Sequence, residues 1–148
     1  MAIARTITNN GLKELTKLHA KILDPMVAGR PFSHIGIGKG TATPMITDVG
    51  LQDEVKDGSN APIRRAAAVI LDPAQTGDPD MTTVMYVATW NPGEIASGNE
   101  EVAITEVGLF NGPNTGDICY YRETRGVLTI SGTVGLTIKI RCRFSRIV

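Results

Sequence analysis

The most regular pattern in this chain is the alternation of apolar and polar residues near its end. Apolar side chains stand at every second position over 136–144, and Lys139, Arg141 and Arg143 lie among the residues between them. A strand with this pattern has one face in a core and the other face in water or docked on a polar partner. A second alternating strand is predicted over 83–90.

Shorter apolar segments predict further strands. They lie over 32–37, 63–71, 102–110, 117–123 and 127–130, and turn signals rich in Gly, Pro, Asn and Asp separate them. The predicted β region therefore extends from about residue 32 to about 146. Several short strands with turns between them are typical of an antiparallel β-sandwich or a partly closed barrel.

One helix is predicted before the strands, over about residues 10–23. Asn9 and Asn10 are N-cap candidates, and Asp24-Pro25 ends the helix. The apolar positions at helical spacing are Leu12, Leu15 and Ile22. This stripe must be buried, so we expect the helix to pack on the β region. The fold class is therefore mainly β with one N-terminal α-helix, and the length of 148 residues indicates a single domain over 1–148.

Two glutamates interrupt apolar or turn-rich segments. Glu106 lies inside a predicted strand, and Glu54 lies in the long segment 41–61, which has little periodicity. Long segments of this kind are often functional. A carboxylate among apolar neighbours is either turned outward or paired inside the protein. Arg64 or Arg65 is a candidate partner for one glutamate, and exposure of all four side chains is the alternative.

The composition excludes several classes of protein. Hydrophobic residues make up 42% and charged residues 20% of the chain, which is typical of a globular protein. No apolar run is long enough to cross a bilayer, and the N-terminus lacks a secretory signal, so we expect synthesis in a cytoplasm. A formal net charge of zero gives no general attraction to nucleic acid or anionic lipid.

The charges are divided unevenly along the chain. Five acidic and no basic residues lie over 94–117, whereas six basic residues and one acid, Glu123, lie over 122–146. Either both groups are solvated loops and strand faces, or they form complementary surfaces between neighbouring copies. Within one copy, Glu123 is an alternative partner for the bases. The interface residues in the second interpretation are Glu100, Glu101, Lys139, Arg141 and Arg143.

A glycine-rich segment over 36–41 does not match a phosphate-binding loop. Ser33 stands where the first glycine should be, and Gly40 follows the lysine. No helix pattern follows that could direct backbone amides at a phosphate. The glycines instead predict the exit of a strand with positive φ values.

Catalytic and metal-binding patterns are also missing. His19 and His34 have no second ligand at metal-binding spacing. Cys119 and Cys142 lie in apolar strands and are expected to be buried free thiols, although a disulfide is possible if their strands pair. We therefore expect no catalytic residue, no metal and no cofactor, and hence no enzymatic activity and no small-molecule substrate.

Four segments occur in an order that resembles a family of bacteriophage virion proteins, the tail-collar and tail-fibre-root proteins. They are the start of the helix (8–12), the "IGxG" strand over 35–40, the "LxxEV" segment over 51–55 and the "ITEVGLF" strand over 104–110. The closing strand over 136–144 completes the resemblance. The family implies a structural component located in the virion, which forms multimers and docks on other virion proteins.

The resemblance further implies a collar, neck or baseplate subunit, or an adaptor at the root of a tail fibre. The chain stops at Val148 directly after its last strand, so we expect no fibre shaft or receptor-binding tip. The partners would be further copies of the chain, as a trimer or ring, and other phage proteins.

The alternative function is a carbohydrate-binding, adhesin-like sandwich. Its stacking platform would be Trp90, Tyr86, Tyr120 and Tyr121, which the strand pattern places in the core. A small hydrolase acting on cell-wall glycan, through two of the glutamates, is a third class.

Overall fold

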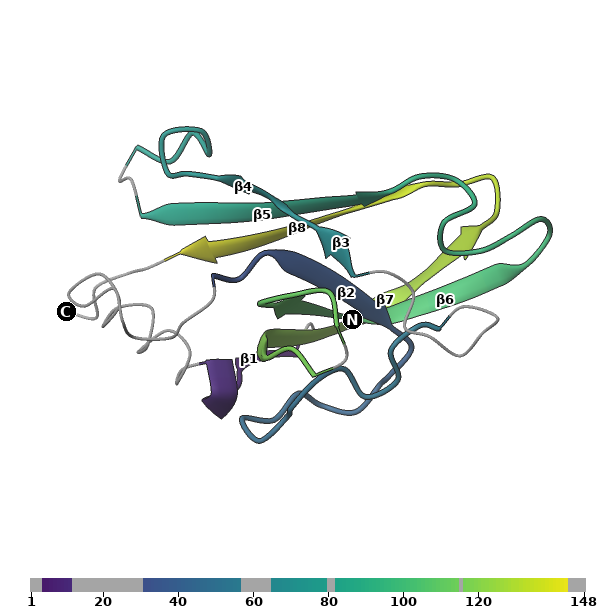
Figure 1. Ribbon diagram of the computed structural model, residues 1–148, viewed down its shortest axis with the longest axis horizontal. Coiled ribbons are helices and arrows are strands. Elements are labelled where there is room, and N and C mark those ends of the chain that lie inside the picture. The colour runs from purple at the N-terminus through teal and green to yellow at the C-terminus, as the bar shows by residue number, and fades with distance from the viewer. Residues whose placement is uncertain (1–3, 12–30, 57–64, 80–81, 115, 144–148) are drawn as a thin grey trace.

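The computed structural model of the chain describes residues 4–11, 31–56, 65–79, 82–114 and 116–143. Two antiparallel sheets lie face to face as the two layers of a sandwich (Figure 1). A large sheet has the strand order β1-β7-β6-β2-β3, and a small sheet has the order β4-β5-β8. The strands are β1 (Ala4–Ile7), β2 (His34–Gly38), β3 (Ala66–Ala67), β4 (Val69–Leu71), β5 (Thr83–Trp90), β6 (Glu101–Phe110), β7 (Cys119–Ser131) and β8 (Leu136–Arg143).

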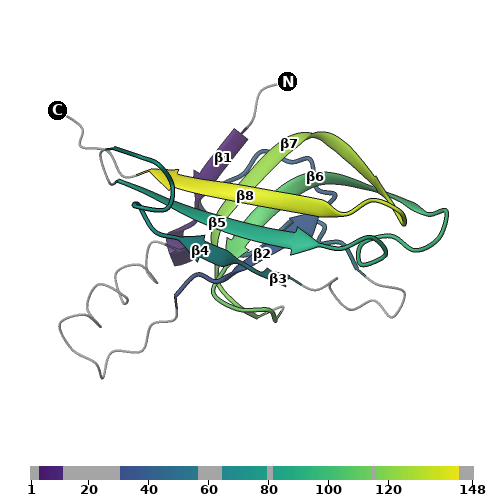
Figure 2. The same ribbon diagram turned by 90° about the horizontal axis from the view of Figure 1, so that it is seen from above.

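The prediction of a mainly β antiparallel sandwich is confirmed. Neither sheet closes on itself, so the sandwich is the alternative that describes the fold. Figure 2 looks down on the sandwich and shows β5 and β8 crossing over β6 and β7. Antiparallel sheets can pack in this way because each buries one face and leaves the other in contact with solvent.

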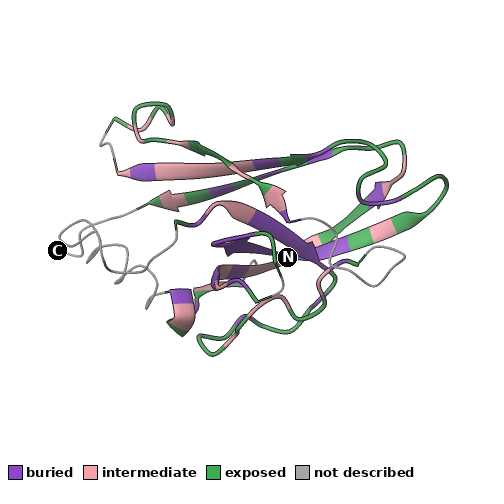
Figure 3. Ribbon diagram, viewed as in Figure 1, coloured by how far each residue is buried: buried purple, intermediate pink, exposed green. Residues whose placement is uncertain are grey.

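The core lies between the inner faces of the two sheets (Figure 3). The alternation of β8 is confirmed, because Leu136, Ile138 and Ile140 are buried and the residues between them are exposed. The small sheet also contributes Ala88 and Trp90 to the core. The large sheet contributes Ile35, Ile37, Ile104, Val107, Leu109 and Ile130.

The structure differs from the prediction where the chain leaves one sheet for the other. The single strand predicted over 63–71 is two strands, because β3 pairs with β2 in the large sheet and β4 pairs with β5 in the small sheet. Between them, Ala68 N donates to Ser33 O at 2.8 Å. A short segment at a sandwich corner can therefore serve both sheets.

The two strands predicted over 117–123 and 127–130 form one strand, β7. The expected interruption is a β-bulge, in which residues 125–127 of β7 lie opposite Thr105 of β6. Bulges accommodate extra residues without ending the pairing of two strands. The strand β1, which pairs with β7, was not predicted.

The predicted helix can be followed only at its start. Residues 9–11 are helical, and residues 12–23, with the apolar stripe, lie outside the described residues. The N-cap is Thr8, because Gly11 N donates to Thr8 Oγ1 at 3.0 Å. The expectation that Asn9 or Asn10 caps the helix is wrong.

Candidate functional site

A long loop over 39–56 covers one half of the outer face of the large sheet, below β2 and β6 in Figure 1. Backbone hydrogen bonds join its two ends to each other and to β2. Lys39 N donates to Asp53 O at 2.8 Å, and Val55 N donates to Ile37 O at 3.0 Å. This part of the molecule therefore has three layers: the small sheet, the large sheet and the loop.

Glycines on the outer face of the large sheet make room for the loop. Gly36 of β2 lies opposite Gly108 of β6. A Cβ atom on Gly36 would lie 2.9 Å from the ring of Phe110, and one on Gly38 would lie 2.4 Å from Glu106 Oε1. Among the described residues, positive φ values occur elsewhere, so the prediction of positive φ values in segment 36–41 is wrong. Close approach, not backbone conformation, requires these glycines.

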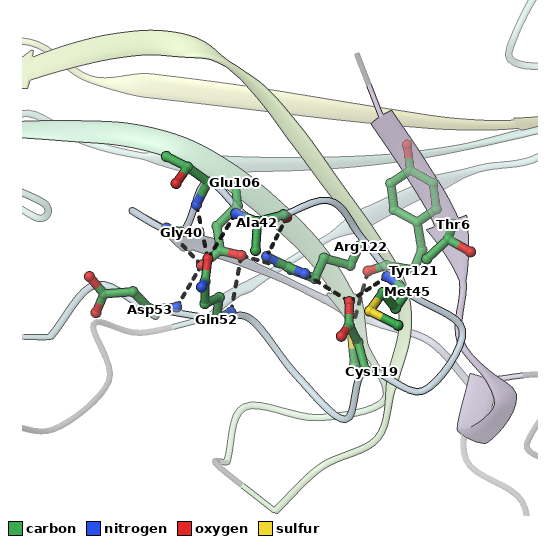
Figure 4. Close-up of polar contacts among 12 residues, drawn as sticks. Thr6, Gly40, Ala42, Met45, Gln52, Asp53, Glu106, Cys119, Tyr121 and Arg122 are labelled. Carbon is green, nitrogen blue, oxygen red and sulfur yellow. Dashed lines mark hydrogen bonds and ion pairs between the residues drawn. The ribbon is translucent and has the colours of Figure 1, made fainter. Parts of the chain in front are cut away.

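Glu106 of β6 lies on this outer face and is completely buried beneath the loop. Its Oε1 accepts hydrogen bonds from Gly40 N at 3.0 Å and Asp53 N at 2.8 Å. Its Oε2 accepts from Gln52 N at 3.1 Å and from Arg122 Nε at 2.8 Å (Figure 4). Two peptide segments of the loop therefore converge on one carboxylate of the sheet.

Arg122 of β7 is the charge that balances Glu106. Its Nη1 donates to Asp48 Oδ2 at 2.7 Å, and its Nη2 donates to Ala42 O at 3.1 Å. Its side chain is 2% exposed. Burial lowers the pKa of Arg122, but its hydrogen bonds to Asp48 and Glu106 outweigh this effect and raise the pKa. The guanidinium thus stays charged and joins both ends of segment 42–48 to the sheet.

A second buried ion pair lies at the other side of the loop. Arg65 Nε donates to Glu54 Oε1 at 2.6 Å, and its Nη2 donates to Oε2 at 3.0 Å. The guanidinium lies 3.6 Å from the centre of the Phe110 ring, and its Nη1 also donates to Asn114 O. The prediction that Arg64 or Arg65 pairs with one of the glutamates is confirmed for Arg65 and Glu54.

Comparison with protein-family models, characterised proteins and solved structures finds no match to this chain. No helix within the described residues is long and apolar enough to cross a membrane. Nor do three His, Cys, Asp or Glu side chains come together as metal ligands in the described ranges. What distinguishes the site is therefore the set of contacts that Glu106, Arg122, Arg65 and Glu54 make between the loop and the large sheet.

Both ion pairs position the loop, and the carboxylate of Glu106 is closed to solvent. Four donors occupy the oxygens of Glu106, so this group has no free lone pair for a hydrogen bond from a substrate. The result is a fixed loop that presents apolar side chains outward. Met45 is 59% exposed, Ile46 57% and Val49 75%. Asn9 N donates to Ile46 O at 2.7 Å and ties this segment to the start of the helix.

The structure divides the two charged groups between interior and surface. Glu106 and Arg122, one from each group, pair with each other inside the chain. Asp117 is also buried and accepts a hydrogen bond from Asn114 N at 2.7 Å. The stretch over 94–117 is therefore not a uniformly acidic surface. The five predicted interface residues, Glu100, Glu101, Lys139, Arg141 and Arg143, are all exposed.

The five predicted interface residues do not meet within one chain. Glu101 lies opposite Ser131, at the end of β7 that leads into β8, whereas Arg141 lies near the far end of β8 on the other sheet. Glu101 and Arg141 of one copy are therefore too far apart to pair with each other. Glu123, the alternative partner, accepts a hydrogen bond from the hydroxyl of Tyr121.

The histidine and cysteine side chains of the described residues lie in partly or fully buried positions. The Nδ1 atom of His34 lies 2.9 Å from Ser33 Oγ, and partial burial lowers its pKa. Burial raises the pKa of Cys119 to about 12, so its thiol stays protonated. Cys119 and Cys142 are both free thiols, and the strands β7 and β8 do not pair with each other. His19 lies outside the described residues.

The aromatic residues do not form a surface platform. Trp90 is 2% and Tyr120 5% exposed, and Tyr120 stacks on Phe32 in the core. Tyr86 and Tyr121 are half-buried against the core. The prediction that these rings are core residues is confirmed for Trp90 and Tyr120.

Proposed function

We propose that this chain is a non-enzymatic structural component of a bacteriophage particle. It would form an oligomeric collar or neck subunit, or an adaptor of a tail fibre or baseplate, that docks other virion proteins. The observation that carries the proposal is the convergence of three sequence segments on Glu106. The "ITEVGLF" strand supplies Glu106, the "IGxG" strand leads to Gly40, and the "LxxEV" segment supplies Gln52 and Asp53.

This convergence gives the resemblance a physical basis. Each of the three segments is weak evidence alone, because glycines and glutamates near strands are common. Together they build one unit, in which paired glycines admit a loop and a buried carboxylate holds it.

The surface of the loop supports a docking role. Loops on rigid scaffolds commonly carry binding function, and clustered exposed apolar side chains are typical of interaction sites. Met45, Ile46 and Val49 lie within five residues of one another, on a segment whose backbone the ion pairs fix. The alternative of a carbohydrate-binding module is weakened, because Trp90 and Tyr120 are buried and cannot stack on a sugar.

The proposal is tested on purified particles of the phage that encodes the chain. Antibodies raised against the recombinant protein should label one position on the tail or neck in immunogold electron microscopy. An antibody against an abundant host cytoplasmic protein is the control and should give no label. A nonsense mutation in the gene should give particles without tails or fibres. The proposal fails if density-purified particles contain no trace of the chain by mass spectrometry.

A further inference from the structure

The outer face of the small sheet combines apolar and basic side chains. Cross-strand pairing places Val69, Val87 and Lys139 in one row, and Leu71, Met85 and Arg141 in the next. Because Ile138 and Ile140 of β8 are buried, these two rows point away from the core. Val69 is 64% exposed. The face is therefore apolar over β4 and β5 and basic along the β8 edge.

Two of the three basic residues on this face have no ion pair among the described residues. Within the described part of the chain, Lys139 and Arg141 make no ion pair, whereas Arg143 already has an internal interaction. Like charges that stand in a row along one strand edge repel one another unless an acidic group lies nearby. An acidic partner surface would remove this repulsion.

A bare half of the large sheet offers such a surface. The loop over 39–56 covers only the half that contains Glu106. Beyond the bulge, Glu101 pairs with Ser131 and Ala103 pairs with Thr129, and these side chains lie on the same outer face. Figure 3 shows the exposed ends of β6 and β7. Val127, in the bulge itself, is 65% exposed. Within the described residues, the bare half therefore carries small and apolar side chains, with Glu100 and Glu101 at one end.

We propose that the outer face of the small sheet in one copy packs on the bare half of the large sheet in the next copy. Lys139 and Arg141 would face Glu100 and Glu101, and Val69 and Met85 would cover the bare half. The inference rests on the proposed function and deepens it, because it names a second copy of this chain as the partner. Charge complementarity between the basic edge of one face and the acidic end of the other selects a second copy as the occupant.

The geometry makes the contact head-to-tail. The two faces lie on opposite outer sides of the sandwich, so one copy cannot join its own two faces (Figure 1). Each copy uses a different face toward each neighbour. A heterologous contact of this kind closes into a ring when the rotation between copies permits, and otherwise continues as a filament. Exposed ion pairs add little affinity, so apolar burial holds the contact and the charges set its register.

Charge reversal tests the contact, with sedimentation velocity as the measurement. Lys139→Glu with Arg141→Glu should raise the dissociation constant of assembly by about tenfold or more. Glu100→Lys with Glu101→Lys should do the same, and the variant with all four changes should assemble again. Lys39→Glu with Lys56→Glu is the matched control, because both lysines are exposed on the loop, and it should assemble like the parent. Tryptophan fluorescence of each variant checks that the fold is intact.

Cysteine crosslinking tests the head-to-tail arrangement. A Val69→Cys copy mixed with a Thr129→Cys copy should give a crosslinked dimer with a short bismaleimide, and neither variant alone should. A crosslink of Val69→Cys with itself indicates a two-fold contact and overturns the proposal. A parent chain that stays monomeric at millimolar concentration, or a four-fold variant that stays dissociated, also overturns it. The particle labelling described above is a separate readout: label with a monomeric chain refutes only this contact, whereas assembly without label refutes only the virion role.

Discussion

At the scale of single residues, the glycines of β2 and β6 have the clearest role. Gly36 and Gly108 lie opposite each other, and Gly38 faces the carboxylate of Glu106. A side chain at any of these positions would occupy space that the loop or a buried charged group now fills. Their backbone conformation is that of an ordinary strand. The constraint on them is therefore steric and comes from the tertiary structure.

Gly38→Ala tests this role. The new Cβ atom would lie 2.4 Å from Glu106 Oε1 and 2.8 Å from the backbone oxygen of Asp53, so either the loop or the carboxylate must move. We expect the free energy of unfolding to fall by about 1–3 kcal/mol. The measurement is the midpoint of urea unfolding. Gly50→Ala is the matched control, because a Cβ atom there meets nothing within 4 Å, and its midpoint should be unchanged.

At the scale of elements, one ion-pair network joins the loop to the sheet. Arg122 contacts Glu106 on the neighbouring strand and two residues of the loop, Ala42 and Asp48. Burial of a charge is unfavourable unless the charge is paired and hydrogen-bonded, and here the polar groups of Glu106 and Arg122 all have partners. The loop is consequently a fixed layer of the protein and presents the same apolar side chains in every copy.

Arg122→Met tests the network. The substitution keeps an apolar stem and leaves Glu106 buried without its opposite charge, so we expect a loss of about 3–5 kcal/mol in the free energy of unfolding. The double variant Arg122→Met with Glu106→Gln should regain part of this loss, because no unpaired charge stays buried. Lys139→Met, at an exposed base, should change stability by less than about 0.5 kcal/mol. Equal stability of Arg122→Met and Lys139→Met would show that the network does not hold the loop.

At the scale of the whole molecule, the two sheets and the loop depend on one another. The core joins residues of both sheets in one cluster, and the loop is attached to the large sheet by buried groups. Within the described residues, the apolar inner face of each sheet is covered by the other sheet. The prediction of a single domain therefore has a direct thermodynamic consequence.

Urea unfolding followed by two probes tests the single domain. Trp90 is the one tryptophan of the chain and is 2% exposed between the sheets, so its fluorescence reports on the core. Far-ultraviolet circular dichroism reports on the strands of both sheets. We expect both signals to change in one transition with the same midpoint. Two separated midpoints would mean that one sheet persists without the other.

The parts of the fold that could be predicted are those with a local signal. The strands β5 and β8 were predicted within a residue of their observed ends, because alternation over eight residues records which side of a strand faces the core. The pairing of Arg65 with Glu54 was one of the alternatives, since a buried carboxylate needs a nearby base. The role of Arg122 was missed. The available signal was that Arg122 follows four apolar residues, just as Glu106 interrupts an apolar strand.

By itself, the sequence determined the fold class, the positions of most strands and, for β5 and β8, which residues share a face. These properties follow from the period of apolar residues, which is contained within a few neighbouring positions. Only the tertiary structure decided that Arg122 reaches Glu106 and Asp48, the latter 74 residues away, and that the glycines admit a loop. It also decided that residues 66–71 divide between two sheets. Such contacts join residues that lie far apart in the sequence, and the period of apolar residues within one strand does not indicate which loop packs on its outer face.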